Sequence, residues 1–319
     1  MTLNHKHKIG ILCGTILAPL VVGLGLLGCR PADEKQIVIG LTVPSLSHPF
    51  FVCLKKHVED EAKKLGVRVI TMDAEDVSAK QMSIIEDFIA QGVDGVLMAP
   101  IGAEALTPAV EALNRAHVPV ATVDRKVAGG DILVHVGADN VAGGRAAARY
   151  IVAKLGGKGA VIELEGTPGA SPAIDRKKGF DEVLAASSMK LLASQAADFY
   201  RAKGQSVMEN LLQAHHDFQA VYAANDEMVL GALEALAAHG LSPARVVTVG
   251  FDVIPDAAKC IKEGRLTASI EQFPGQQGRQ ALRLLVDHIR KGQLPPSKQV
   301  LLKPIAIDKN NLDQAERKD

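Results

Sequence analysis

Short apolar runs alternate with stretches of helical periodicity from residue 36 to about residue 307. The apolar runs are rich in Val and Ile, and between them hydrophobic residues recur at intervals of three and four, as in Leu230, Leu233 and Leu236. This alternation is typical of repeated βαβ units, in which helices cover a parallel sheet. The predicted strands are 37–43, 67–72, 95–99, 119–123, 132–136, 160–164, 191–194, 220–223, 246–249 and 266–270.

Ten strands are many for one doubly wound sheet, whereas two sheets of about half that size suit domains of ordinary length. We therefore predict an α/β protein with two doubly wound parallel sheets. The polar segment 308–319 is predicted to be a frayed tail.

The first 28 residues do not fit the repeating pattern. Lys6 and Lys8 precede a charge-free apolar run over 9–27, which predicts an export signal over 1–28. The run ends in Leu-Leu-Gly-Cys and resembles the lipobox of bacterial lipoproteins, which implies that Cys29 is lipidated and begins a short linker over 29–35. An uncleaved membrane anchor remains the alternative, because the run is nearly long enough to span a bilayer. Either way, the body of the protein is expected outside the cytoplasm, in the periplasm or at the cell surface.

The charge balance and the motifs exclude several classes of partner. Thirty-six basic residues balance 36 acidic ones, so no overall field would recruit a nucleic acid. The ten His include no HExxH motif or Cys/His cluster, so we expect no metal. A GxGxxG pattern at 23–28 is not flanked by a strand and a helix, and we expect no cofactor. Cys53 and Cys260 show no disulfide spacing and are predicted to be buried free thiols, although an exported protein could pair them.

Candidate binding residues gather after the predicted strands. In open parallel sheets, ligands bind beyond the carboxyl ends of the strands, where loops and helix N-termini converge. The carboxylates, guanidinium groups and amides found there can hold the hydroxyls of a neutral polyhydroxylated molecule, and aromatic faces can cover its C–H faces. Each polar residue taken alone could be an ordinary cap or salt bridge. The candidates are His48, Phe50, Phe51, Asp124, Arg125, Arg176, Phe199, Asn225, Asp252 and Gln272.

An enzyme is disfavoured, and we predict no catalytic residues. Ser171 lies outside any GxSxG elbow, and no neighbouring feature sets one carboxylate as acid and another as base. A glycoside hydrolase with its two acids on separate strands remains the alternative.

Seven segments of the chain resemble the ribose-binding group of periplasmic sugar-binding proteins: PFFVCLKK, VDR, ELEGTPGASPAIDRKKGF, QAADF, AANDEMVLGALEAL, VGFD and IEQFPGQQG. Proteins of this group serve ABC importers and share their fold with the ligand domains of lactose-repressor-type regulators. The resemblance implies two lobes that close on a monosaccharide and are linked by three chain crossings. It implies lobes over 36–138 with 273–301, and over 139–272 with 302–319.

The same resemblance implies a role for each candidate. Phe50 and Phe51 from one lobe and Phe199 from the other would sandwich the sugar ring, although core packing is the alternative for Phe50 and Phe51. The residues that would hold its hydroxyls are Asp124, Arg125, Arg176, Asn225, Asp252 and Gln272.

Two positions depart from the ribose pattern: His48 stands where that group usually has Asn, and Pro44 where it usually has Ser. Imidazole is bulkier than an amide, and Pro lacks a backbone donor. We therefore expect ribose or a related pentose or ketose, with His48 setting the choice. The alternative is that His48 turns outward and caps a helix beginning at Pro49.

The expected function is that of an extracytoplasmic lipoprotein that presents a sugar to the permease of an ABC importer. A sugar-sensing module for a chemoreceptor or a sensor kinase is the alternative, because such a module would keep the same site. A transcription factor is disfavoured, since the chain carries an export signal and no N-terminal helix-turn-helix.

Overall fold

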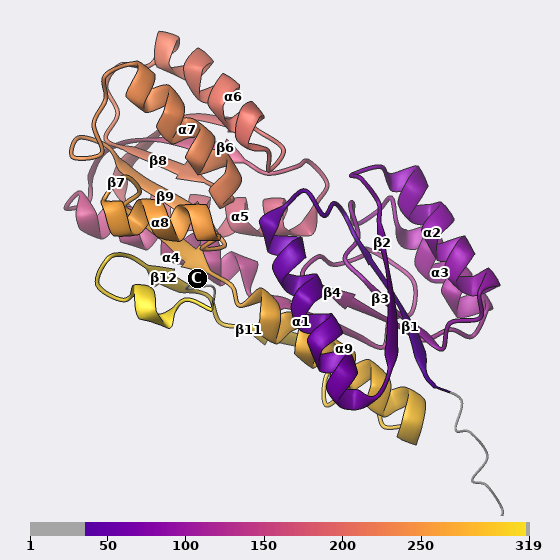
Figure 1. Cartoon of the computed structure of the whole chain (residues 1–319). Helices are drawn as coiled ribbons and strands as arrows, with labels where there is room; N and C mark the ends of the chain where they lie inside the picture. Colours follow the sequence, from indigo (N-terminus) through magenta and orange to yellow (C-terminus); the bar gives the residue numbers. More distant parts are fainter. Residues whose placement is uncertain (1–35, 317–319) are drawn as a thin grey trace, which may run out of the picture. The chain divides into compact units, whose positions relative to one another are not determined.

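The computed structural model describes residues 36–316, and these contain two six-stranded sheets, each the centre of one lobe (Figure 1). The first sheet has the order β11-β5-β4-β3-β1-β2 and is parallel throughout. Its strands are β1 (Val38–Val43), β2 (Arg68–Asp73), β3 (Gly95–Met98), β4 (Val120–Val123), β5 (Val134–Ala138) and β11 (Gln299–Leu302).

The second sheet has the order β12-β10-β9-β8-β6-β7, and only the β10–β12 pair is antiparallel among its described strands. Its strands are β6 (Lys158–Glu165), β7 (Ser188–Ala196), β8 (Ala220–Ala223), β9 (Val247–Phe251), β10 (Ala268–Glu271) and β12 (Ile305–Ile307).

Helices cover both faces of each sheet. In the first lobe, α1 (Pro49–Leu65) packs with α9 (Pro274–Lys291), and α2 (Ser78–Ala90) packs with α3 (Thr107–Arg115). In the second lobe, α4 (Asn140–Lys154) packs with α5 (Ser171–Ala185), and α6 (Arg201–Ala214) packs with α7 (Asp226–Ala238), while α8 (Pro255–Glu263) lies next to α7. The apolar stripes of these helices and the buried strands form a hydrophobic core on each face of each sheet.

The chain passes between the lobes three times: from β5 to α4, from β10 to α9, and from β11 to β12. These three crossings connect the two lobes, which lie together in one compact unit. Within 36–316, no helix is both long and apolar enough to cross a bilayer. The predicted export signal and Cys29 lie outside the described residues.

The prediction of two parallel sheets is confirmed, and the ten predicted strands correspond to β1–β10. Two strands were not predicted. Both β11 and β12 are short edge strands, of 4 and 3 residues, on either side of Lys303 and Pro304. Their apolar runs are too short to show a period of their own.

The prediction of a frayed tail is wrong as far as Glu316. Asp308 accepts a hydrogen bond of 2.8 Å from the Tyr150 hydroxyl, and a short 3₁₀ helix, η1 (Leu312–Gln314), leads into Ala315, which is 1% exposed. The Glu316 carboxylate accepts from the Gly275 N–H and from Arg279, at 2.7 and 2.8 Å. The prediction assumed that the polar side chains of this segment face solvent, whereas Asp308 and Glu316 bond to residues of distant elements.

Candidate binding site

A cavity lies between the lobes, at the carboxyl ends of the strands of both sheets. Its unfilled space is about 420 Å³, including the part open to solvent at the mouth. The structure brings all ten residues predicted to contact the ligand to this cavity. The complete lining is His48, Pro49, Phe50, Phe51, Asp124, Arg125, Pro172, Arg176, Phe199, Asn225, Glu227, Asp252, Ile254 and Gln272.

Two rings of the first lobe line the cavity from the first turn of α1. The helix begins at Pro49, whose fixed φ and missing N–H suit the first helical position. Phe50 and Phe51 follow, with their rings perpendicular and their centroids 5.1 Å apart. Both are also members of the hydrophobic core of the first lobe, and Phe51 is only 3% exposed. These rings therefore serve the core and line the cavity at once.

Phe199 lines the cavity from the second lobe. It follows β7 in a left-handed conformation, with φ of 67°. Its ring covers Gly166, where a Cβ would come within 2.1 Å of the ring, so only glycine allows this approach. The guanidinium carbon of Arg125 lies 5.4 Å from the centroid of the Phe51 ring and 5.6 Å from that of Phe199, in the range of cation–π contacts. A cation of the first lobe thus lies near one ring of each lobe.

Asp124 and Arg125 follow β4 and are 4% and 6% exposed. Asp124 has a φ of 63°, and Arg125 donates one hydrogen bond of 3.1 Å from Nη1 to the Ile101 carbonyl. Arg125 Nε is 3.8 Å from Asp124 Oδ2 and has no hydrogen-bond partner among the described residues. Burial raises the pKa of Asp124 to about 6, although Arg125 and Arg176 oppose the shift. This pair therefore keeps hydrogen-bonding capacity for a bound molecule.

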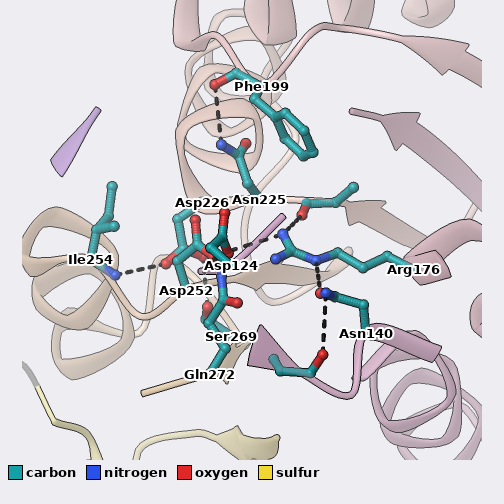
Figure 2. Close-up of polar contacts among 12 residues, drawn as sticks. Asp124, Asn140, Arg176, Phe199, Asn225, Asp226, Asp252, Ile254, Ser269 and Gln272 are labelled. Carbon is teal, nitrogen blue, oxygen red and sulfur yellow. Dashed lines mark hydrogen bonds and ion pairs between the residues drawn. The ribbon is translucent and has the colours of Figure 1, made fainter. Parts of the chain in front are cut away.

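Arg176 is held much more firmly, on α5 of the second lobe (Figure 2). Its Nε donates to Asn140 Oδ1 at 2.8 Å and its Nη1 to the Ala224 carbonyl at 2.6 Å, while Nη1 also lies 3.7 Å from Asp252 Oδ1. Its guanidinium carbon is 3.6 Å from the centroid of the Phe251 ring. The close approach of α4 and α5 depends on Gly144, where a Cβ would lie 2.0 Å from the Arg176 carbonyl oxygen.

Asn225, Asp252 and Gln272, three further polar residues of the site, also make hydrogen bonds within the protein. Asn225 caps α7, because its Oδ1 accepts from the Met228 N–H at 3.0 Å, and its Nδ2 donates to the Phe199 carbonyl at 3.1 Å (Figure 2). Asp252 Oδ1 accepts a hydrogen bond from Gln272 Nε2. The cap interpretation thus holds for Asn225, which still lines the cavity with a second amide hydrogen available.

Asn140 and Asp226 support the site but are not among the candidates selected from the sequence. Asn140 is 4% exposed and fixes Arg176, and Asp226 accepts bonds from the Ile254 N–H and the Ser269 hydroxyl (Figure 2). Asn140 follows a predicted strand, so the rule that located the other candidates also applied to it. Asp226 is adjacent to the candidate Asn225, but nothing in the sequence indicated its partners.

His48 occupies the N-cap position of α1, but its side chain makes no capping hydrogen bond, so the capping alternative is wrong. The imidazole is buried and turns instead to Asp76, with 3.6 Å between Nε2 and Oδ2. The Asp76 N–H donates to the Pro44 carbonyl at 2.7 Å. The two positions that depart from the ribose pattern therefore both contact Asp76.

In the described region Cys53 lies on α1 and Cys260 on α8, and no disulfide joins them. Cys260 is buried, whereas Cys53 is only half-buried, contrary to prediction. Over residues 36–316, no three His, Cys, Asp or Glu side chains are grouped to hold a metal ion.

The comparisons with known proteins agree with this geometry. A model of the periplasmic binding protein domain matches residues 39–293. The ribose import binding protein RbsB of Bacillus subtilis is 47% identical over 249 residues, which cover 78% of this chain and 80% of that protein. RbsB of Salmonella typhimurium is 43% identical over 278 residues, covering 87% and 93%. The crystal structure of a Caulobacter myo-inositol binding protein bound to myo-inositol is 40% identical with a TM-score of 0.85, covering 91% of this chain and 99% of that one.

Proposed function

Because the chain belongs to the periplasmic binding protein family, we propose that it captures a monosaccharide between its lobes and delivers it to the permease of an ABC importer. It is a solute-binding protein and not an enzyme. The proposed ligand is ribose or a related pentose or ketose. The proposed lobes are 36–138 with 273–301, and 139–272 with 302–319.

One observation carries this proposal: a buried Arg125 lies near Phe51 of its own lobe and Phe199 of the other, with Nε unpartnered beside Asp124. A sugar offers what this site lacks, since a hydroxyl accepts from Nε and donates to a carboxylate, while the ring C–H faces contact the aromatic rings. Arg176, Asn225 and Asp252 supply donors and acceptors from the second lobe. Contacts to both lobes favour the closed arrangement when sugar is bound.

A thermal-shift screen against pentoses, hexoses, ketoses and polyols, including D-ribose and myo-inositol, tests the proposal. Ligand at one hundred times its dissociation constant should stabilise the folded protein by about 2.7 kcal/mol. Calorimetry on the strongest ligands then gives their affinities. If no sugar or polyol shifts the transition at 10 mM, the proposal fails.

The importer role is tested in cells that lack this protein. We expect uptake of the radiolabelled sugar to be lost and to return with the gene. Normal uptake with a lost transcriptional or chemotactic response to the sugar would instead assign the protein to sensing.

His48 is proposed to influence which sugar is preferred, because it lines the cavity where the ribose-binding group usually has Asn. An imidazole occupies more space than an amide and offers one donor and one acceptor. We expect His48→Asn to raise the affinity for ribose relative to the natural ligand. An unchanged order of preference across the panel would remove His48 from the specificity residues.

Cys29 is proposed to be lipidated after removal of residues 1–28. Two or three acyl chains, at about 0.8 kcal/mol for each buried CH₂ group, anchor a protein stably where one chain does not. We expect Cys29→Ser to give an unprocessed or a soluble form on fractionation. Recovery of a processed Cys29→Ser protein in the membrane fraction would contradict the lipobox interpretation.

A further inference from the structure

Three side chains meet at the cleft between the lobes: His48 and Asp76 from the first lobe and Tyr200 from the second. The Tyr200 hydroxyl donates a hydrogen bond to Asp76 Oδ2, and His48 Nε2 lies 3.6 Å from the same oxygen. The rings of His48 and Tyr200 are tilted by 40°, with centroids 5.0 Å apart. We refer to these three residues as the clasp.

We propose that the clasp holds the closed arrangement of the lobes, so that Tyr200 and Asp76 determine how long any sugar stays bound. The inference rests on the proposed sugar binding and adds two affinity-determining residues to it.

The position of the clasp in the fold supports this role. Asp76 follows β2 of the first sheet, whereas Tyr200 precedes α6 of the second lobe, so their bond must break when the lobes separate at the hinge. Tyr200 also directly follows Phe199, whose ring lines the cavity. Closing the clasp therefore places the second-lobe ring over the ligand. Neither Tyr200 nor Asp76 lines the cavity itself, so their effect should not depend on which sugar is bound.

The first-lobe side of the clasp is held rigidly. Asp76 has a φ of 55° and is fixed through its N–H to the Pro44 carbonyl. The hydrogen bond from Tyr200 and the nearby His48 imidazole outweigh the effect of partial burial and lower the pKa of Asp76, so its carboxylate stays ionised. A hydrogen bond to a charged acceptor is stronger than one between neutral groups. His48 belongs both to the clasp and to the cavity wall, and so connects the two.

The clasp is one of several direct contacts between the lobes. The Ala103 N–H donates to the Gly169 carbonyl at 3.1 Å, the Lys126 N–H donates to the Ser171 hydroxyl at 2.8 Å, and Lys126 Nζ pairs with Asp175 Oδ2 at 2.5 Å. None of these contacts uses Tyr200 or Asp76, so a substitution at Tyr200 leaves them in place. The Tyr200 hydroxyl can be removed alone by Tyr200→Phe, which keeps the ring beside His48.

The test compares Tyr200→Phe with Tyr150→Phe as a matched control. Tyr150 also donates its hydroxyl to an aspartate, Asp308, but both residues belong to the second lobe. Calorimetry and dissociation kinetics are measured for every sugar of the panel that the wild type binds. For Tyr200→Phe we expect about tenfold weaker binding, by the same factor for each sugar and through faster dissociation. Tyr150→Phe should leave the affinities within twofold of the wild type.

A double-mutant cycle and solution scattering complete the test. Adding Asp76→Ala to Tyr200→Phe should weaken binding little beyond the stronger single variant, since the two residues share one bond. Without sugar, small-angle scattering should show a larger radius of gyration for Tyr200→Phe than for the wild type if the clasp biases the lobes toward closure.

Unchanged affinity in Tyr200→Phe would overturn the clasp, as would an equal loss in Tyr150→Phe. A loss that varies from sugar to sugar would also overturn it, because Tyr200 would then act on the ligand directly. Failure of the wild type to bind any sugar would instead overturn the proposed function.

Discussion

Arg125 and Arg176 reach the same cavity from opposite lobes, and their surroundings differ. Arg176 has two hydrogen bonds, an ion pair with Asp252 and the face of Phe251, all within the second lobe. Arg125 has one hydrogen bond, a long approach to Asp124 and an unpartnered Nε. The second lobe therefore holds its arginine in place, whereas the arginine of the first lobe keeps an unpartnered donor for the proposed ligand. Because the side chains of the second lobe are already held in place, less conformational entropy is lost when a ligand binds.

The largest effect should come from Arg176→Met. Breaking a buried ion pair deprives Asp252 of its guanidinium partner, and Asn140 loses its donor as well. We expect the free energy of unfolding to fall by about 3–5 kcal/mol and sugar binding to be lost. Urea unfolding measures the first effect and calorimetry the second. If Arg176→Met were as stable as the wild type, Arg176 would not be held more firmly than Arg125.

The pH dependence of stability should reveal the weaker pairing of Asp124. Its pKa is raised from 3.8 to about 6, so between these values the folded state binds more protons than the unfolded state. The free energy of unfolding should therefore fall as pH rises from 4 to 6, by about 3 kcal/mol from this group, and level off above 6.

Asp124→Asn isolates this contribution from the other carboxylates. Urea unfolding at pH 4, 5, 6 and 7 should show the stability of the wild type, relative to Asp124→Asn, declining across the window. A pH-independent difference between the two proteins would show that Asp124 titrates normally.

Arg125→Met should weaken binding while sparing the fold. The guanidinium gives few bonds to its own lobe, so we expect the free energy of unfolding to change by less than about 1 kcal/mol. Its loss leaves Asp124 and a sugar hydroxyl without a donor, which should reduce affinity about 30-fold, or about 2 kcal/mol. If Arg125→Met destabilised the protein as much as Arg176→Met, the two arginines would not differ in how firmly their lobes hold them.

The smallest effect should follow Phe199→Leu. Leucine keeps apolar contact above Gly166 but loses the aromatic face toward the sugar and Arg125. A ring contact of this kind contributes about 0.5–1.5 kcal/mol beyond its buried area, so we expect a three- to tenfold loss of affinity by calorimetry. Phe180→Leu, in the core between α4 and α5, is the control that should lower stability and leave affinity unchanged.

The sequence predicts the fold well because each strand from β1 to β10 has its own apolar run and is separated from the next by a helix or a loop. It fails for β11 and β12, which are edge strands of 3 or 4 residues near Pro304. It fails for the tail because the partners of Asp308 and Glu316 lie 158 and up to 45 residues away.

The cavity lining follows from one rule, that parallel strands end at one edge of a sheet, and ten residues selected by it and by the resemblance line one cavity. The hydrogen bonds that each of these residues makes could not be predicted from the sequence. Nothing in the order of residues distinguishes the firmly held Arg176 from the sparsely bonded Arg125. The clasp could not be predicted either, since Asp76 and Tyr200 are separated by 124 positions and belong to different lobes.

The attachment of Glu316 at the hinge has a practical consequence for reporter design. Its N–H donates to Glu271 Oε2 at the end of β10, while its carboxylate accepts from Gly275 and Arg279 at the start of α9. The described chain therefore ends beside the crossing from β10 to α9, which belongs to the hinge in the proposed closure of the lobes. A dye at position 316 would travel little on sugar binding, whereas a dye pair across the mouth of the cleft would travel furthest. An optical sugar sensor built from this protein should carry its fluorophores at the mouth and its surface tether at the C-terminal end.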